Sequence, residues 1–579
     1  MKTHIALYLR NFRHQLAYLD ALPQLTFLAL LAGVATGTVV VGFRLLVDLP
    51  LLSLPEHIDN FEGLPQSARF WLPLFGATAL GALLMWLPSR RIKVGVGHVL
   101  DRLHNHQGHM PASNFFVQFF GGITCLITGQ SVGREGPSVH LGAATASFVG
   151  RWLRIPNNSM RTLIGCGVAA GISASFNTPL AGVIFAMEVV MMEYTIAGFI
   201  PIIISSVTGA IITRAMFGHD HSFVIAHSQL TSLYEFPFMI VIGIGIGLSA
   251  TTYSWILRSS LSVAHWPMVI RFAIAGGLTG LTALVFPEIL GLGYDTIEDA
   301  IAGNFSLQLL LAIALTKLVI SSAAIGLGLP GGLIGPTLVI GACLGGAFGI
   351  IGQSISGVHS DGLYVLIGMT AMMGAVLNAP LAALVAILEL THNPNVIFPS
   401  MMVVVIASLV TRRLFNADGV FLALLSAQGH NIDSNAPRRE LSRIGVLSVM
   451  NTQFVVSDPV LECDDAHQLL NNQPLWIIFE NPETQSLNAL RAADLASFLD
   501  SAPEKVLTLE ESIQLAELPG KRLAIYPIHD TANLLEAHQL MKAHNAEAVY
   551  VERSHRPVVG TSIVGIISRD AINNHYKVH

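Results

Sequence analysis

"GREGPSVHLGA", residues 133–143, decides the fold because the chain carries a second version of it, "GLIGPTLVIGA", at 332–342. The glycines and the proline recur in register, whereas the charged pair Arg134 and Glu135 is replaced by two apolar residues. Proline suits the first turn of a helix, and glycine lets the backbone approach a ligand closely. Each copy therefore predicts a helix that begins with free amide groups, the kind of helix end that binds anions.

A second pair of sequences repeats at nearly the same spacing. "NTPLAGVIFAMEV" at 177–189 matches "NAPLAALVAILEL" at 378–390 with an offset of 201, against 199 for the first pair. Internal repeats in a membrane protein are typical of secondary transporters and related channels, whose site forms where discontinuous helices of both repeats meet. We expect repeat one at about residues 70–195 and repeat two at about residues 269–395.

The composition is that of a membrane protein. Charged residues make up only 12% of the 579 residues, and the mean hydropathy is +0.60. Soluble domains carry about twice that share of charge. Charge-free runs of roughly 20 residues, enough to cross the hydrocarbon, recur between about residues 21 and 411. The sequence therefore predicts an all-α, polytopic membrane domain.

Several classes of function are excluded by what the sequence lacks. The net charge of −6 is small for this length and predicts no nucleic-acid partner. The four scattered cysteines show no Cys-x-x-Cys spacing, and the histidines at 104–109 and 219–221 lack supporting carboxylates. We therefore expect no metal site and no cofactor. Zinc-protease, nucleophile-elbow and phosphate-loop signatures are missing, so we expect no catalytic residues and no enzyme.

The distribution of charge divides the chain. Basic residues at the start and just past the last apolar run, such as Arg13 and Arg412, favour cytosolic termini and a place in the cytoplasmic membrane. After about residue 436, strand-like runs alternate with polar helix-like ones, as in an α/β domain. The expected parts are a cytosolic segment at 1–24, a membrane domain at 25–430, a linker at 431–439 and a cytosolic α/β domain at 440–579.

The charged pair of the first copy is not needed to start a helix, because the second copy starts without it. The positive end of a helix dipole can bind a dehydrated halide without a full counter-charge. Glu135 beside such a site can take the place of the ion, and protonation would remove its charge and free it to swing away. We therefore expect Glu135 to gate an anion pathway and Arg134 to set the local potential. The alternative is that the two side chains pair with each other or cap the helix.

Four stretches together resemble the CLC family of chloride channels and chloride/proton antiporters: "GREGP" at 133–137, "GGLIGP" at 331–336, "FNTPLAGVIFAMEV" at 176–189 and "NAPLAALVAILELT" at 378–391. The resemblance covers roughly residues 25–430. It implies two inverted repeats of tilted and re-entrant helices, in a homodimer whose subunits each pass chloride or similar monovalent anions. It also makes Glu135 the gate. The anion-binding residues that it implies are Gly133, Arg134, Gly136 and Pro137 of the first copy and Gly332, Leu333 and Ile334 of the second.

Two positions depart from the pattern of this family at the anion itself. By spacing, Val94 and Gly95 lie in the first anion motif, where Val94 replaces a serine whose hydroxyl usually helps to hold the central ion. Phe421 replaces a tyrosine whose hydroxyl usually meets the same ion. If both residues face the anion, the ion rests on backbone amides alone.

A third departure concerns protons. Val189 stands where antiporters of the family commonly carry an inner glutamate, so we expect a channel-like conductor. The alternative is a chloride/proton antiporter with another internal proton route. Glu188 could substitute in that route, although helix packing explains it equally well. His140, five residues past Glu135, is expected to be a packed polar residue rather than a proton relay.

The tail resembles a tandem pair of CBS motifs. Nucleotide-binding CBS pairs typically show Ser or Thr followed three residues later by Asp. Here Ser568 is followed by Ala571, and Arg491 precedes Asp494. Neither half is complete, so nucleotide binding is doubtful and we expect a structural or gating-coupled tail.

Overall fold

The computed structural model divides the chain into two compact units. A membrane unit spans 25–152 and 161–432, and a second unit gathers 1–24, 153–160 and 433–579. The residues that the structure describes are 12–17, 21–52, 61–88, 92–218, 223, 235–356, 362–414, 419–427, 429, 440–482, 485–501, 512–553 and 562–577. The predicted linker at 431–439 and the histidines at 219–221 lie outside these residues.

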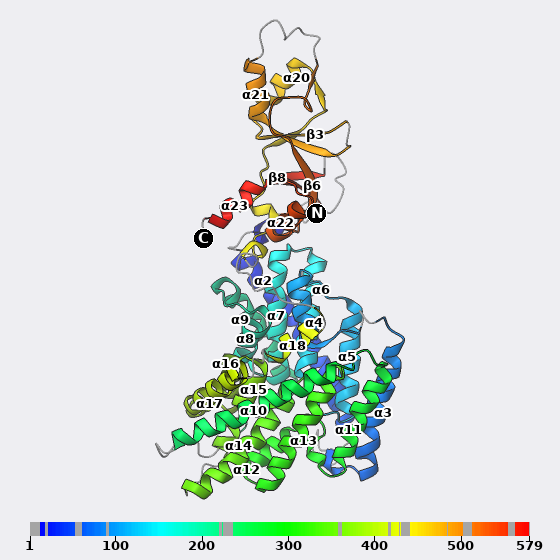
Figure 1. The fold of residues 1–579 in the computed structure, drawn as a ribbon, viewed down its shortest axis with the longest axis vertical. Coiled ribbons are helices and arrows are strands. Elements are labelled where there is room, and N and C mark those ends of the chain that lie inside the picture. The colour runs from blue at the N-terminus through cyan, green and yellow to red at the C-terminus, as the bar shows by residue number, and fades with distance from the viewer. Residues whose placement is uncertain are drawn as a thin grey trace. The chain divides into compact units, whose positions relative to one another are not determined.

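The membrane unit is helical (Figure 1). Its α-helices are α2 (Leu22–Leu51), α3 (Gln66–Met85), α4 (Gly95–Asn105), α5 (Ala112–Ile127), α6 (Glu135–Leu153), α7 (Asn157–Phe176), α8 (Pro179–Phe185), α9 (Ile196–Phe217), α10 (Glu235–Leu261), α11 (Met268–Ala283), α12 (Tyr294–Ala302), α13 (Leu307–Gly326), α14 (Ile334–Ser356), α15 (Leu363–Leu377), α16 (Pro380–Thr391), α17 (Ile397–Leu409) and α18 (Val420–Ala427). Seven of the described helical segments are long and apolar enough to cross a membrane. Others, such as α4, α8 and α16, are too short to do so, in agreement with the predicted broken helices.

The two Gly-Pro copies start equivalent helices, as predicted. α6 begins at Glu135 and α14 begins at Ile334, at the offset of 199 found in the sequence. α8 and α16 likewise begin at Pro179 and Pro380, where proline occupies the first turn without losing a helical hydrogen bond. The structure therefore confirms both helix starts that the repeats predict.

Each repeat caps a helix of the other. The Glu389 carboxylate accepts the N–H groups of Leu180 and Ala181, at 2.9 and 2.8 Å, in the first turn of α8. Glu188 does the same for α16, where the N–H of Ala382 donates to its Oε2 at 2.7 Å. Carboxylates at helix N-termini are stabilising, because they satisfy free amides and face the positive end of the dipole. These bonds support the packing alternative for Glu188.

The second unit contains the tail, which has the expected α/β character (Figure 1). Its elements are β1 (Phe454–Val456), β2 (Val460–Leu461), α20 (Cys463–Asn471), β3 (Trp476–Glu480), β4 (Leu487–Arg491), α21 (Ala492–Ser501), β5 (Ile513–Gln514), β6 (Leu523–His529), α22 (Leu534–Ala543), β7 (Ala548–Glu552), β8 (Ile563–Ser568) and α23 (Arg569–Lys577). The main sheet has the order β1-β3-β4-β6-β7-β8. β1 and β3 are parallel and β3 and β4 antiparallel, and β6, β7 and β8 repeat that arrangement, as the tandem motif predicts.

A short segment between α6 and the body of α7 belongs to this second unit. Residues 153–160 share it with the tail and with the first residues of the chain. Asn157 Nδ2 donates to Glu536 Oε1 at 2.9 Å, and Arg13 Nε donates to the Leu153 carbonyl at 2.9 Å. Burial raises the pKa of Glu536, although the bond from Asn157 opposes that shift. Three separate stretches of chain thus fold together as one body.

Candidate functional site

The two Gly-Pro copies meet at the centre of the site. The N–H of Gly133 donates to the Gly332 carbonyl at 2.7 Å, and the N–H of Gly332 donates to the Gly133 carbonyl at 2.6 Å. This antiparallel bridge holds the starts of α6 and α14 together. It also uses both amides, so neither is left for an anion. Among the predicted residues, Gly136, Leu333 and Ile334 have backbone amides outside this bridge at the two helix starts.

The carboxylate of Glu135 lies in a cradle of glycines from both repeats. The side chain is fully buried, and Oε2 lies 2.5 Å from where a Cβ on Gly332 would stand. Oε1 lies 2.9 Å from the equivalent point on Gly335, and the carboxylate also packs on Gly133. Within the described residues, neither oxygen accepts a hydrogen bond of good geometry, but the backbone N–H groups of Glu135 and Gly335 face the carboxylate. The side chain is therefore held by packing and by these two amides, with no side-chain donor.

Arg134 is positioned by aromatic rings. Its guanidinium lies over the rings of Phe176 and Tyr294, 5.3 Å from each centroid. Such stacking leaves a cation charged. The Glu135 oxygens accept no hydrogen bond from this guanidinium, although its positive charge acts on the carboxylate.

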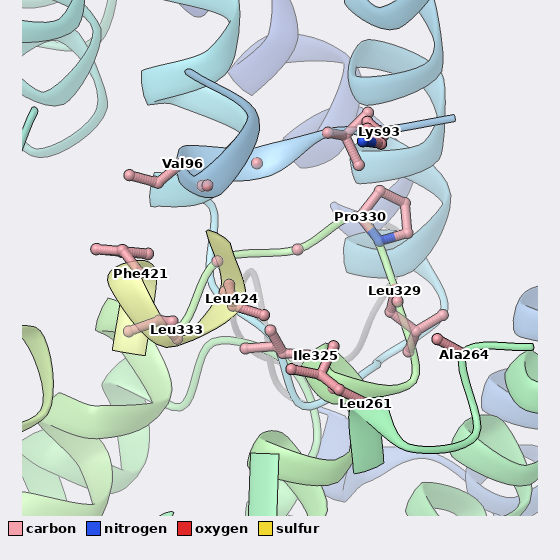
Figure 2. Close-up of a pocket in the computed structure, with 18 of the residues that line it drawn as sticks. Lys93, Val96, Leu261, Ala264, Ile325, Leu329, Pro330, Leu333, Phe421 and Leu424 are labelled. Carbon is pink, nitrogen blue, oxygen red and sulfur yellow. The ribbon is translucent and has the colours of Figure 1, made fainter. Parts of the chain in front are cut away.

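A cavity of about 340 Å³ opens at the helix starts (Figure 2). The predicted site residues that line it are Val94, Gly95, Gly136, Gly332, Leu333, Ile334 and Phe421. The remaining predicted residues, Gly133, Arg134, Glu135 and Pro137, are not part of its lining. The structure thus gathers most of the predicted anion-binding residues around one space, and Glu135, the predicted gate, directly precedes the lining residue Gly136 in the chain.

The lining is apolar where the family usually has hydroxyls. Val94 precedes α4 at its N-cap and offers no side-chain oxygen to cap the helix. Phe421 packs edge-on against Phe185, with centroids 6.5 Å apart. Each missing hydroxyl removes a hydrogen bond of about 0.5–1.5 kcal/mol net. Apart from the cations Lys93 and Arg271, the polar groups that remain in the lining belong mainly to the backbone, including the starts of α4 and α14.

Gln118 is a positioning residue that sequence reasoning missed. This fully buried side chain of α5 accepts the N–H of Gly95 at 2.7 Å and donates to the Pro330 carbonyl at 2.9 Å. One turn earlier, Asn114 Nδ2 donates to the Lys93 carbonyl at 2.7 Å. The four-residue spacing of two amides in an apolar run was the available signal, because it puts both on one helix face.

These bonds bear on the predicted anion-binding role of Gly95. Its N–H donates to Gln118 Oε1. Gly95 and the next two residues of α4, Val96 and Gly97, all line the cavity. α4 therefore still presents a helix N-terminus to the site, one residue further along than the motif suggests.

We expect Gln118→Leu to weaken chloride binding by roughly tenfold, because two buried bonds that set the loop spacing are lost at about 1 kcal/mol or more each. The check is the chloride dependence of flux in proteoliposomes. Gln130→Leu is the matched control, since buried Gln130 bonds to the Pro73 carbonyl at 2.7 Å and does not line the cavity. Equal affinity loss in both variants would reduce Gln118 to a stability role.

Two buried histidines join the helices that carry the site. His98 of α4 and His140 of α6 are stacked, with Nδ1 and Nε2 2.9 Å apart. Arg102 Nε donates to His98 Nε2 at 3.2 Å, so His98 must carry its proton on Nδ1 and donate it to His140. A guanidinium only donates, so it cannot accept a proton from the pair. The geometry supports the predicted packing role for His140.

The position at which antiporters of the family commonly carry an inner glutamate contains no titratable group in this chain. Val189 is buried in a π-helical turn, Ala186–Met191, that follows α8. Its neighbour Glu188 is used to cap α16. Within the described residues, the candidate proton pathway therefore has no carboxylate at the position where the motif would place one.

The tail has a cavity of its own, about 400 Å³ in volume. Arg491, Asp494 and Ser568 face it together, as the CBS-like motifs predict. Three cations and three carboxylates stand around it: Arg491, Lys521 and Arg569 with Asp494, Glu547 and Asp570. Their charges balance, and Lys521 pairs with Glu547. This balance supports the prediction that nucleotide binding is doubtful.

Comparison with known proteins identifies the membrane unit. Residues 76–412 match the family model described as voltage gated chloride channel. A putative chloride channel protein, ClcB-like, of Ralstonia nicotianae is 28% identical over 64% of this chain and 88% of its own length. The H(+)/Cl(-) exchange transporter ClcA of Vibrio parahaemolyticus is 28% identical over 69% of this chain and 88% of its own.

Solved structures share the fold. A slow cyanobacterial Cl-/H+ antiporter superposes with a TM-score of 0.62 at 21% identity, over 70% of this chain and 97% of its own. A eukaryotic CLC transporter superposes with a TM-score of 0.59 at 19% identity, over 96% of this chain and 99% of its own. The paired Gly-Pro helix starts, the glycine cradle and these matches lead to one conclusion: the chain is a multi-pass membrane protein of the CLC family, with the CLC fold and anion transport as its function.

Proposed function

We propose that each subunit passes chloride and similar monovalent anions across the cytoplasmic membrane through a pore gated by Glu135, with both termini in the cytosol. The observation that carries the proposal is the Glu135 carboxylate, buried between the N-termini of α6 and α14 and facing backbone amides of both. A negative group fits there because helix N-termini favour anions. An anion arriving from the cavity competes with the carboxylate for the same electrostatic position.

An anion that is bound only by backbone amides and helix dipoles can be conducted, because it is not held too tightly. The free amides at α4, α6 and α14 attract an anion without a full counter-charge, so the ion can also leave. Protonation removes the charge of Glu135 and weakens its attraction to the amides of the helix starts, so the side chain can swing out of its cradle. Flux through the pore therefore depends on pH and on the competing anion.

The channel-like reading is preferred over coupled exchange. Val189 supplies no inner proton carrier, Glu188 caps a helix, and the His98–His140 pair ends at Arg102. The alternative, a chloride/proton antiporter with another route, is favoured by the names of the ClcA relatives, which are exchange transporters.

One experiment separates the two. A chloride gradient is imposed on proteoliposomes without a proton gradient, and internal pH is recorded. Chloride flux without uphill proton movement is expected for the channel-like protein. Sustained uphill proton movement, abolished by a protonophore, would establish exchange.

The proposal includes a homodimer. α8, α9, α16 and α17 expose large apolar side chains beside the exchanged caps, among them Leu180, Ile211, Leu381, Phe398 and Leu409. Continuous apolar surface of this kind serves a lipid or a subunit contact. Light scattering of the detergent-solubilised protein is expected to give twice the chain mass of 62.0 kDa. A protein mass equal to one chain would leave these helices to lipid.

A further inference from the structure

The cavity at the helix starts carries charge of one sign. Lys93 and Arg271 line it, and no carboxylate of the described residues does. Lys93 precedes α4, and Arg271 lies in the first turn of α11. Most of the remaining side chains are apolar, as Leu261, Ile325 and Leu424 in Figure 2 illustrate.

Hydrogen bonds fix the main chain at Lys93 and the guanidinium of Arg271. The Lys93 carbonyl accepts Asn114 Nδ2, which fixes the residue just before the α4 start. Arg271 Nη1 donates to the Leu327 carbonyl at 2.9 Å and lies 3.2 Å from where a Cβ on Gly328 would stand. This loop leads to the bridge glycine Gly332. In the part of the chain that the structure describes, no carboxylate forms an ion pair with either cation.

The cavity has the marks of a cytoplasmic entrance. Arg90 and Arg91 precede Lys93 in the sequence. Basic residues gather on the cytoplasmic side of membrane proteins. A cleft with apolar walls and one sign of charge concentrates the opposite ion by focusing the field.

We propose that Lys93 and Arg271 form a cationic inner mouth that gathers cytoplasmic anions for the amides of α4 and α14. The inference rests on the proposed anion pathway and extends it to the residues that feed it. Their charge acts at long range, whereas the amides act by contact. The mouth therefore sets the local anion concentration and contributes most when external salt is low.

The test uses the full-length protein in proteoliposomes, with chloride flux measured at low ionic strength and again with an impermeant salt added. Lys93→Gln and Arg271→Gln are each expected to slow flux about threefold at low salt, and the double variant about tenfold. The differences should shrink at high salt, because screening replaces the lost field. Lys93→Arg, which keeps the charge, should match the unmodified protein.

Arg258→Gln is the matched control. It removes one positive charge from an exposed position at the end of α10 that does not line the cavity, so flux should be unchanged. Arg271 also holds its loop, so Arg271→Lys is compared with Arg271→Gln to separate charge from folding. Equal flux in Lys93→Gln and the unmodified protein at low salt would overturn the inference. Absence of chloride flux in the unmodified protein would instead overturn the proposed function.

Discussion

Glu135→Gln is expected to leave anion flux in place and to remove its dependence on pH. The amide has the size of the carboxylate but no charge, so it mimics the protonated gate at every pH. Flux of the unmodified protein should rise as pH falls and the carboxylate takes up a proton. Flux of the variant should change by less than about twofold between roughly pH 4 and pH 8, the range in which carboxylates and histidines titrate.

The control for this variant is Glu235→Gln. Glu235 is also buried, accepts the Tyr364 hydroxyl at 3.1 Å and does not line the cavity. The same change of charge there should leave the pH dependence of flux intact. Unchanged pH dependence in Glu135→Gln, measured in the same vesicles, would remove Glu135 from the gate.

Two neighbouring glycines are expected to respond to alanine in opposite ways. A methyl group on Gly133 would fall on the Glu135 carboxylate, which is the free end of a flexible side chain. We expect Gly133→Ala to expel the carboxylate from its cradle, raise flux at neutral pH and weaken its pH dependence. A methyl group on Gly136 would lie 2.7 Å from the Gly331 carbonyl and 2.9 Å from the Gly332 Cα. That backbone is held by the bridge, so Gly136→Ala should lose flux and about 1–3 kcal/mol of stability.

Chloride flux at neutral pH, paired with thermal unfolding of the purified protein, distinguishes the two effects. Higher flux in Gly133→Ala with near-normal unfolding supports the cradle as the closed position of the gate. Loss of flux in both variants would mean that the cradle is a structural feature and not a resting place for a mobile side chain.

The sequence predicted where the helices of the site begin, but it did not predict which hydrogen bonds their backbone amides make. Glycine and proline locate helix starts locally, so Glu135 and Ile334 could be placed from the repeat alone. The use of each amide could not, because its partner is distant in sequence. Gly133 bonds to Gly332, and Gln118 reaches Pro330, 212 positions away. Which amides remain free for an anion is therefore a property of the folded chain.

Two further features could not be predicted from the sequence: the cations that share the cavity, and the division of the chain into its two units. Lys93 and Arg271 stand in unrelated sequence contexts, and only the cavity makes them neighbours of one space. Composition placed the α/β tail after about residue 436, but it carried no signal that 153–160 would join that tail. A short polar connection looks the same in sequence whether it faces solvent or another part of the protein.

The exchanged caps of Glu188 and Glu389 follow the rule of an isologous contact, in which one element meets a second and the reverse also holds. Two identical subunits related by a twofold axis make contacts of this kind, and here a single chain makes one with itself. Neither half completes its own helix start, because the carboxylate that does so belongs to the other half. The two halves of the membrane unit thus contact each other as two subunits of a dimer would. The N-termini of both α8 and α16 are capped only when both halves are present.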